Sequence, residues 1–248
     1  MIELNKIYNG DCIEVLKTFP DNFVDLVVTS PPYNCGIKYD SYEDRIDLDQ
    51  YYTWSKEWMS QIFRVLKRDG RCCINHYLSM GDSQKRHAPL MTLNEIAVKE
   101  IGFKHHGLAL WMDKTLSNKT AWGSWLSASA PYVASPIEGI LILYKEVWKK
   151  EKVGGVSDIS KEDFIMGCRG MWDFATDRKR LTMATFPEEL PKLCIQLFSY
   201  VGDLVLDPFS GSGTTATVAK RIYRDYIGIE LSPNYAKIGE SRAKQVMI

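Results

Sequence analysis

Short apolar runs alternate along the chain with longer amphipathic stretches. The short runs are rich in β-branched and aliphatic residues, as strands are, and they lie at 24–29, 71–75, 107–112, 139–144, 204–207 and 226–230. Apolar residues recur with helical spacing at 11–17, 49–67, 90–101, 187–199, 214–223 and 233–244. This alternation predicts an α/β fold with a doubly wound, mostly parallel sheet.

A glycine-rich turn joins the last two predicted strands to the helix between them. Gly211 and Gly213 follow the strand at 204–207 directly, in the order G-x-G-x-x-A. Glycine lets the backbone come close to a ligand, and the N–H groups at the start of a helix can bind it. Glu230 ends the next strand and can accept both hydroxyl groups of a ribose. The turn therefore predicts a site for a molecule that contains a nucleoside, and a ligand-free tight turn is the alternative.

This unit stands near the end of the sequence, which makes the order of the motifs unusual. An ordinary dinucleotide fold places several strands after its first strand–helix–strand unit, whereas the sequence stops soon after Glu230. We therefore expect N-terminal strands to complete the sheet, in a circularly permuted order. Ligands bind where the strand order of such a sheet reverses, which would place the glycine turn beside the loop after the strand at 24–29.

That loop has the sequence Ser30-Pro31-Pro32-Tyr33, in which two prolines prevent a strand or helix from continuing. A rigid surface turn would explain the loop alone. Thr29–Asn34 and the run at 207–215 together, however, resemble two motifs of the beta-class DNA amino-methyltransferases. In that family the catalytic tetrapeptide, here Ser30–Tyr33, precedes the S-adenosylmethionine motif. The resemblance covers nearly the whole chain. It implies one methyltransferase domain over 1–248, a seven-stranded Rossmann-like sheet, S-adenosyl-L-methionine as cofactor and double-stranded DNA as substrate.

The tetrapeptide supplies what methylation of a base amine requires. The lone pair of an exocyclic amine is delocalised into the ring, so its N–H groups need acceptors that favour a pyramidal nitrogen. Ser30 Oγ and the Pro31 carbonyl can accept two such hydrogen bonds, and Tyr33 offers a ring on which a flipped base can stack. The candidate catalytic residues are Ser30, Pro31, Pro32 and Tyr33.

The resemblance also implies cofactor contacts. Glu230 would bind the ribose, and Asp11 would face the adenine amine. The other candidates, which would line the methionine part or flank the cofactor, are Phe186, Pro187, Asp207, Phe209, Gly211, Gly213 and Thr214. Simpler explanations exist for Asp11 as a helix N-cap, Glu230 as a solvated strand end and Phe186 as core. No metal is expected, since the six cysteines form no C-x-x-C pair.

The first residue of the tetrapeptide predicts the target base. In the family, serine there is associated mainly with N4 of cytosine, and aspartate or asparagine with N6 of adenine. Ser30 is a neutral acceptor that can also donate, for example to cytosine N3, whereas a carboxylate would repel that ring nitrogen. Cytosine N4 is the preferred target and adenine N6 the alternative. An RNA or protein amine methyltransferase, an NAD-linked dehydrogenase and a catalytically silent DNA-binding module are the remaining hypotheses.

The overall charge gives no footprint of a nucleic-acid partner, because 31 Lys and Arg balance 31 Asp and Glu. We expect DNA contacts from a loop-rich basic insert at about 145–185 that would recognise the target. The loop at 35–47 is acidic and is predicted to act as a lid. Trp122–Trp125 is a candidate for the rim that faces DNA, although a packing role explains it equally well.

The hydrophobic content of 45% excludes a disordered chain, and no apolar run approaches the ~20 residues of a membrane helix. We expect a cytoplasmic enzyme without a membrane partner, either a monomer or a homodimer. The resemblance implies restriction–modification as its setting, with a cognate endonuclease as a candidate partner.

Overall fold

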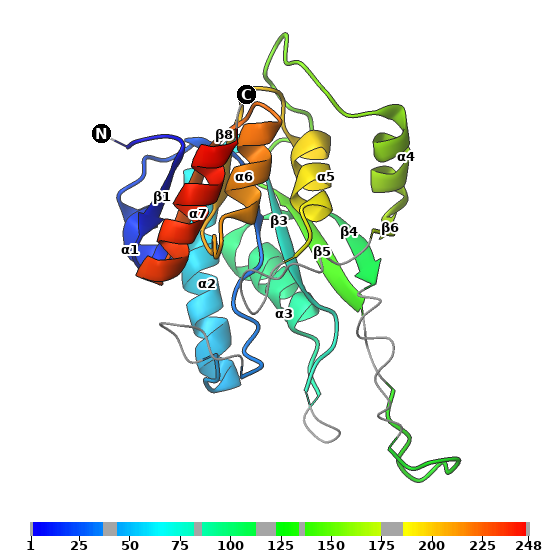
Figure 1. The fold of residues 1–248 in the computed structure, drawn as a ribbon. Coiled ribbons are helices and arrows are strands. Elements are labelled where there is room, and N and C mark those ends of the chain that lie inside the picture. The colour runs from blue at the N-terminus through cyan, green and yellow to red at the C-terminus, as the bar shows by residue number, and fades with distance from the viewer. Residues whose placement is uncertain are drawn as a thin grey trace.

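The computed structural model describes residues 2–36, 44–81, 86–112, 123–133, 137–174 and 186–246. Within them, one eight-stranded sheet has the order β1-β8-β7-β2-β3-β5-β4-β6. Figure 1 shows the ribbon of the whole fold. The strands are β1 (Lys6–Asn9), β2 (Val24–Thr29), β3 (Leu66–Tyr77), β4 (Lys104–Met112), β5 (Ile137–Tyr144), β6 (Met171–Trp172), β7 (Leu204–Asp207) and β8 (Asp225–Glu230). The pairs β3·β5 and β4·β5 are antiparallel and the other neighbours are parallel.

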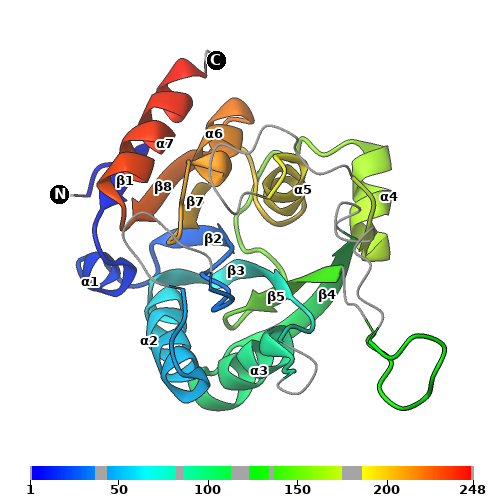
Figure 2. The ribbon, with the colours of Figure 1, turned by 60° about the horizontal axis from the view of Figure 1, so that its bottom comes forward.

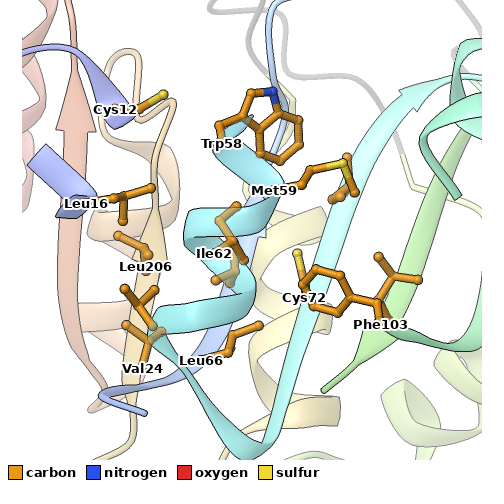
Figure 3. Packing of buried hydrophobic residues seen from close by; sticks show 14 of the residues in the cluster. Cys12, Leu16, Val24, Trp58, Met59, Ile62, Leu66, Cys72, Phe103 and Leu206 are labelled. Carbon is orange, nitrogen blue, oxygen red and sulfur yellow. The ribbon is translucent and has the colours of Figure 1, made fainter. Parts of the chain in front are cut away.

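Helices cover both faces of this sheet (Figure 2). One face carries α1 (Cys12–Lys17), α2 (Leu48–Val65) and α3 (Pro89–Glu95), and the other carries α4 (Lys161–Arg169), α5 (Glu189–Phe198), α6 (Thr214–Arg221) and α7 (Pro233–Gln245). Buried side chains form one cluster on each face; Trp58 and Ile62 of α2 lie in the first (Figure 3), and Leu193 of α5 lies in the second. The predicted α/β, doubly wound and mostly parallel fold is confirmed. None of the described helices has the length and hydrophobicity needed to cross a bilayer.

The described sheet has one strand more than the predicted seven. β6 consists of Met171 and Trp172 and pairs with β4 in parallel. Two residues are too few to produce a periodic pattern in the sequence. The pattern also missed β1, because Ile7 is its one fully buried residue.

β3 begins at Leu66, whereas the sequence predicts a strand from Arg71. Arg68-Asp69-Gly70 has the composition of a turn, which is why the preceding helix was expected to end there. In the structure α2 ends at Val65, and Leu66 pairs with Val24 of β2. Pairing with a buried strand therefore outweighs local turn propensity.

The C-terminal strands β7 and β8 lie between β1 and β2. N-terminal strands thus stand on both sides of the C-terminal unit, as expected from the order of the motifs. β2 and β7 are parallel neighbours, with Leu26 opposite Val205 and Val27 opposite Leu206. Their carboxyl ends consequently open at the same edge of the sheet.

The turn between β7 and α6 depends on Gly213, whose φ of 76° is left-handed. A Cβ at this position would lie 2.7 Å from Gly239 Cα on α7. Gly202 is a matched control, because its φ is 78° and no atom lies within 4 Å of its Cβ position. We expect Gly202→Ala to lower the free energy of unfolding by about 1–2 kcal/mol through strain alone.

Gly213→Ala should lower the free energy of unfolding by about 1–3 kcal/mol more than Gly202→Ala does, because its methyl group is forced against α7. Urea denaturation of the two variants measures the difference. Equal losses would contradict the close approach of the turn to α7.

Candidate active site

The two motifs that are far apart in sequence meet at one edge of the sheet. Ser30 follows β2 and Asp207 ends β7, and these strands are neighbours. The hydroxyl of Thr29 donates to Asp207 Oδ1 at 2.7 Å, a buried hydrogen bond between the strand ends. The structure therefore brings the proline loop and the glycine-rich turn together.

Asp207 is a buried carboxyl group at the base of the glycine-rich turn. Its Oδ1 also accepts from Phe209 N–H at 3.1 Å, which fixes the start of the turn. Burial raises the pKa of Asp207 to about 6, against the opposing hydrogen bond from Thr29. Asp207 thus gains a proton more readily than an exposed aspartate does.

The turn itself leaves space beside its backbone. Gly211 has a φ of 50°, and a Cβ there would have no atom within 4 Å. Its N–H donates to Glu230 Oε2 at 2.8 Å, while Ser232 N–H donates to Oε1 at 2.8 Å. Burial raises the pKa of Glu230. Glu230 is therefore held against the turn and is more than a solvated strand end.

Asp11 caps α1, which is the simpler of its two explanations. Its Oδ1 accepts from Ile13 N–H at 2.9 Å and from Glu14 N–H at 3.1 Å. The same residue lies close to Glu230, because the neighbouring Gly10 N–H donates to the Glu230 carbonyl at 3.0 Å. A capping role and a place beside the ribose-binding candidate are thus compatible.

The hydrophobic candidates differ in their surroundings. Phe209 packs edge-on against Trp58 of α2, with 5.3 Å between the ring centroids, and so ties the turn to the core beneath it. Phe186 packs against the second buried cluster, and Pro187 is buried before α5. The position of Phe186 is thus explained by packing against the core, which was the simpler of its two explanations.

Arg242 of α7 holds the turn from the outside, a contact that sequence reasoning missed. Its Nη1 donates to the Ser212 carbonyl at 2.8 Å and to Thr214 Oγ1 at 3.3 Å, and Nη2 donates to Glu188 Oε1 at 3.4 Å. An arginine on an amphipathic helix gives no signal of this role, because most such residues are solvated.

The proline loop is held by polar groups that come from other strands. Ser30 Oγ donates to Tyr33 Oη at 2.8 Å, and Tyr33 Oη donates to Glu138 Oε2 at 2.9 Å. Asn75 Nδ2 donates to both Tyr33 Oη, at 2.8 Å, and Glu138 Oε2, at 2.6 Å. Asn75 and Glu138 were missed in the sequence, although each is a polar residue in an otherwise apolar strand.

A second set of contacts holds the proline backbone. The hydroxyl of Tyr51 on α2 donates to the Pro32 carbonyl at 2.8 Å and lies 3.1 Å from His76 Nε2. His76 is fully buried, and burial lowers its pKa to about 3, so its ring is neutral near pH 7. Pro31 is buried as well. The Pro32 carbonyl is therefore fixed before a substrate arrives.

The ring of Tyr33 is less open than the sequence suggested. It is 9% exposed and stacks on His76, with 4.3 Å between ring centroids. Tyr77 meets it edge-on at 5.0 Å. One face of the ring thus belongs to the protein, and stacking of a base on Tyr33 stays a prediction.

The first part of the basic insert lies away from these loops. Lys145 is 7% exposed and donates to the Leu66 carbonyl at 2.8 Å, where β3 begins. Lys152 pairs with Asp203 just before β7, at 2.7 Å. The starts of β3 and β7 form the edge opposite the proline loop, so Lys145 and Lys152 bind groups of the protein itself at that edge.

The rest of the insert returns towards the site. α4 and β6 are the helix and strand described in it, and β6 runs parallel to β4 towards the edge of the proline loop. Trp172 is buried, and Trp148 stacks on His106 with 4.1 Å between ring centroids. Arg178, Lys179 and Arg180 lie outside the described residues. Target recognition by 145–185 stays a prediction.

The acidic loop is described at its two ends. Asp44 closes it, accepting from Asn34 N–H at 2.7 Å and from Cys35 N–H at 3.0 Å. Residues 37–43 and Trp122 lie outside the described residues. The predicted lid and rim are therefore untested.

This combination of fold and site defines an S-adenosylmethionine-dependent DNA methyltransferase. The chain belongs to the DNA methylase family N6_N4_Mtase, whose model matches residues 24–241. It is 42% identical to the type II methyltransferase M.MjaVI of Methanocaldococcus jannaschii over 70% of this chain and 87% of the relative. It is 30% identical to the DNA adenine methyltransferase YhdJ of Escherichia coli K12, over 97% and 83% of the two chains.

A solved structure supports the cofactor. The structure of TTHA0409 from Thermus thermophilus, complexed with S-adenosyl-L-methionine, matches with a TM-score of 0.75 and 29% identity over 97% of this chain and 95% of that one. The cofactor is S-adenosyl-L-methionine, which supplies an activated methyl group on its sulfonium when bound. The open side of Gly211 and the carboxylate of Glu230 fit its nucleoside.

The pKa of Asp207 predicts a pH dependence of stability. A carboxyl whose pKa is 3.8 when unfolded and about 6 when folded binds its proton more tightly in the folded state. Its protonated form therefore stabilises the fold at low pH, and this contribution is lost as pH rises towards 6 and above. Asp207→Asn stays neutral at every pH. Between pH 5 and pH 7 its free energy of unfolding should therefore rise by about 1 kcal/mol relative to that of the parent.

Urea unfolding of both proteins at several pH values measures the gain. A constant difference between them would contradict the raised pKa.

Proposed function

We propose that this enzyme methylates N4 of cytosine in duplex DNA, after the base has been flipped out of the stack. The observation that carries the proposal is Ser30, which has a neutral hydroxyl. The adenine-modifying members of the beta-class DNA amino-methyltransferases mainly carry aspartate or asparagine at this position. Ser30 Oγ and the Pro31 carbonyl accept the two N–H groups of the target amine. This pairing favours a pyramidal nitrogen, whose lone pair is then available to attack a methyl group.

The site needs no nucleophile of its own. The Pro31 carbonyl and the Ser30 hydroxyl position the amine, and the glycine-rich turn positions the cofactor. The two loops are joined by the bond from Thr29 to Asp207, which are 178 residues apart in sequence. The rate enhancement comes chiefly from holding two reactants in line.

Methylation of adenine N6 is the second candidate. YhdJ, a DNA adenine methyltransferase, is 30% identical over nearly all of this chain. Both bases present an amine next to a ring nitrogen acceptor, so the contacts of Ser30 and Pro31 would serve either one.

Labelled methyl transfer to unmethylated genomic DNA tests the proposal, followed by digestion to nucleosides. We expect N4-methylcytosine as the labelled product. Label on N6-methyladenine alone would overturn the cytosine assignment and support the second candidate. Incubation with RNA serves as the control for the class of polymer.

Two substitutions separate the roles of the two loops. Ser30→Ala should lower kcat by about 10²–10³-fold, because it removes an acceptor of the target amine, with the cofactor Kd unchanged. Glu230→Gln should weaken the cofactor by roughly tenfold and keep most of kcat at saturation, because a charged acceptor of the ribose is lost. Calorimetric titration with the cofactor measures Kd, and initial rates measure kcat. An equal loss of cofactor affinity in the two variants would refute this division of the site.

A further inference from the structure

The hydrogen bonds around Tyr33 fix the direction in which each proton points. Glu138 is 7% exposed, and its Oε2 accepts from Tyr33 and from Asn75. Two donors on one oxygen favour the ionised carboxylate, which can only accept. The single proton of the Tyr33 hydroxyl is therefore donated to Glu138.

The orientation of Asn75 follows from the same carboxylate. The Asn75 atom that lies 2.6 Å from Glu138 Oε2 must be the nitrogen, since an oxygen there would face another acceptor. The second hydrogen of this amide is donated to Tyr33 Oη at 2.8 Å. Tyr33 thus has no proton left for Ser30, and in the 2.8 Å contact between them Ser30 must be the donor.

We propose that Glu138 is a positioning residue that acts on Ser30 through Tyr33. By taking the proton of Tyr33, it makes the Tyr33 oxygen an acceptor and draws the Ser30 hydrogen towards it. The lone pairs of Ser30 Oγ are then left for the N–H of the target amine. The hydroxyl hydrogen of a serine in water can point in any direction. The direction of the Ser30 hydrogen is set by the Glu138 carboxylate on β5.

Burial strengthens this control. Tyr33, Asn75 and Glu138 are all buried, and hydrogen bonds polarise one another more strongly where water is excluded. Without the carboxylate, the Tyr33 proton can turn to Ser30 Oγ and occupy a lone pair. Ser30 would then offer a hydrogen to an amine that has hydrogens of its own.

The proposal also bears on the choice of base. A Ser30 whose proton is committed to Tyr33 does not donate to cytosine N3. Ser30 therefore favours cytosine through its neutral charge, which does not repel N3 as a carboxylate would, and not through its hydrogen.

Four proteins test the connection: the parent, Glu138→Leu, Tyr33→Phe and the double variant. Glu138→Leu should lower the single-turnover rate at saturating DNA and cofactor by about 10- to 100-fold, less than the loss of a direct contact. KM for the cofactor should stay within about threefold. In the Tyr33→Phe background, Glu138→Leu should change the rate by less than about threefold, because its route to Ser30 is already gone.

A conservative variant separates proton direction from charge. The amide oxygen of Glu138→Gln can accept from Tyr33 and Asn75 as Oε2 does, so most of the rate should return. Asp203→Asn is the control for loss of a buried carboxylate, since Asp203 lies at the opposite edge of the sheet. It should lower the melting temperature and leave the rate of the folded enzyme unchanged.

Additive effects in the double variant, or a Glu138→Gln enzyme as slow as Glu138→Leu, would overturn the inference. It rests on the proposed role of Ser30, and the two can fail separately. Full activity of Ser30→Ala refutes the role of Ser30. A slow Ser30→Ala enzyme together with a fast Glu138→Leu enzyme refutes the inference about Glu138 alone.

Discussion

The parallel pairing of β2 with β7 is the constraint on which the rest of the site depends. It brings together two loops that are remote in sequence, and the buried bond from Thr29 to Asp207 joins them where they leave the sheet. A parallel pair cannot be closed by a short hairpin, so the chain must build most of the domain between these strands. The two loops are thus positioned by the register of a single strand pair.

Each loop then has its own support. The glycine-rich turn is held by Glu230 from β8 and Arg242 from α7, whereas the proline loop is held by Asn75 from β3 and Glu138 from β5. The first support lies in the parallel part of the sheet, and the second lies where β3 and β5 run antiparallel. The boundary between the two parts of the sheet therefore coincides with the boundary between the supports of the two loops.

Much of this could be predicted from the sequence, because the two loops carry local signals. Proline restricts the backbone and glycine permits a left-handed one, so both can be recognised in the sequence. The order of the motifs predicts that the two loops meet. The supports carry no such signal. Asn75 and Glu138 act only through the pairing of their strands, and Lys145, which looked like part of a basic surface, is buried by the start of β3. Contacts across strands depend on register, which composition does not encode.

Arg242 gives the end of the described chain a thermodynamic link to the glycine-rich turn. It joins α7 to the Ser212 carbonyl and to Thr214, so the turn cannot loosen without loss of hydrogen bonds to that helix. A ligand that binds the ordered turn and not the disordered one stabilises α7 as well. The converse holds by the same equilibrium, so fraying of α7 weakens the binding of any ligand that requires the ordered turn.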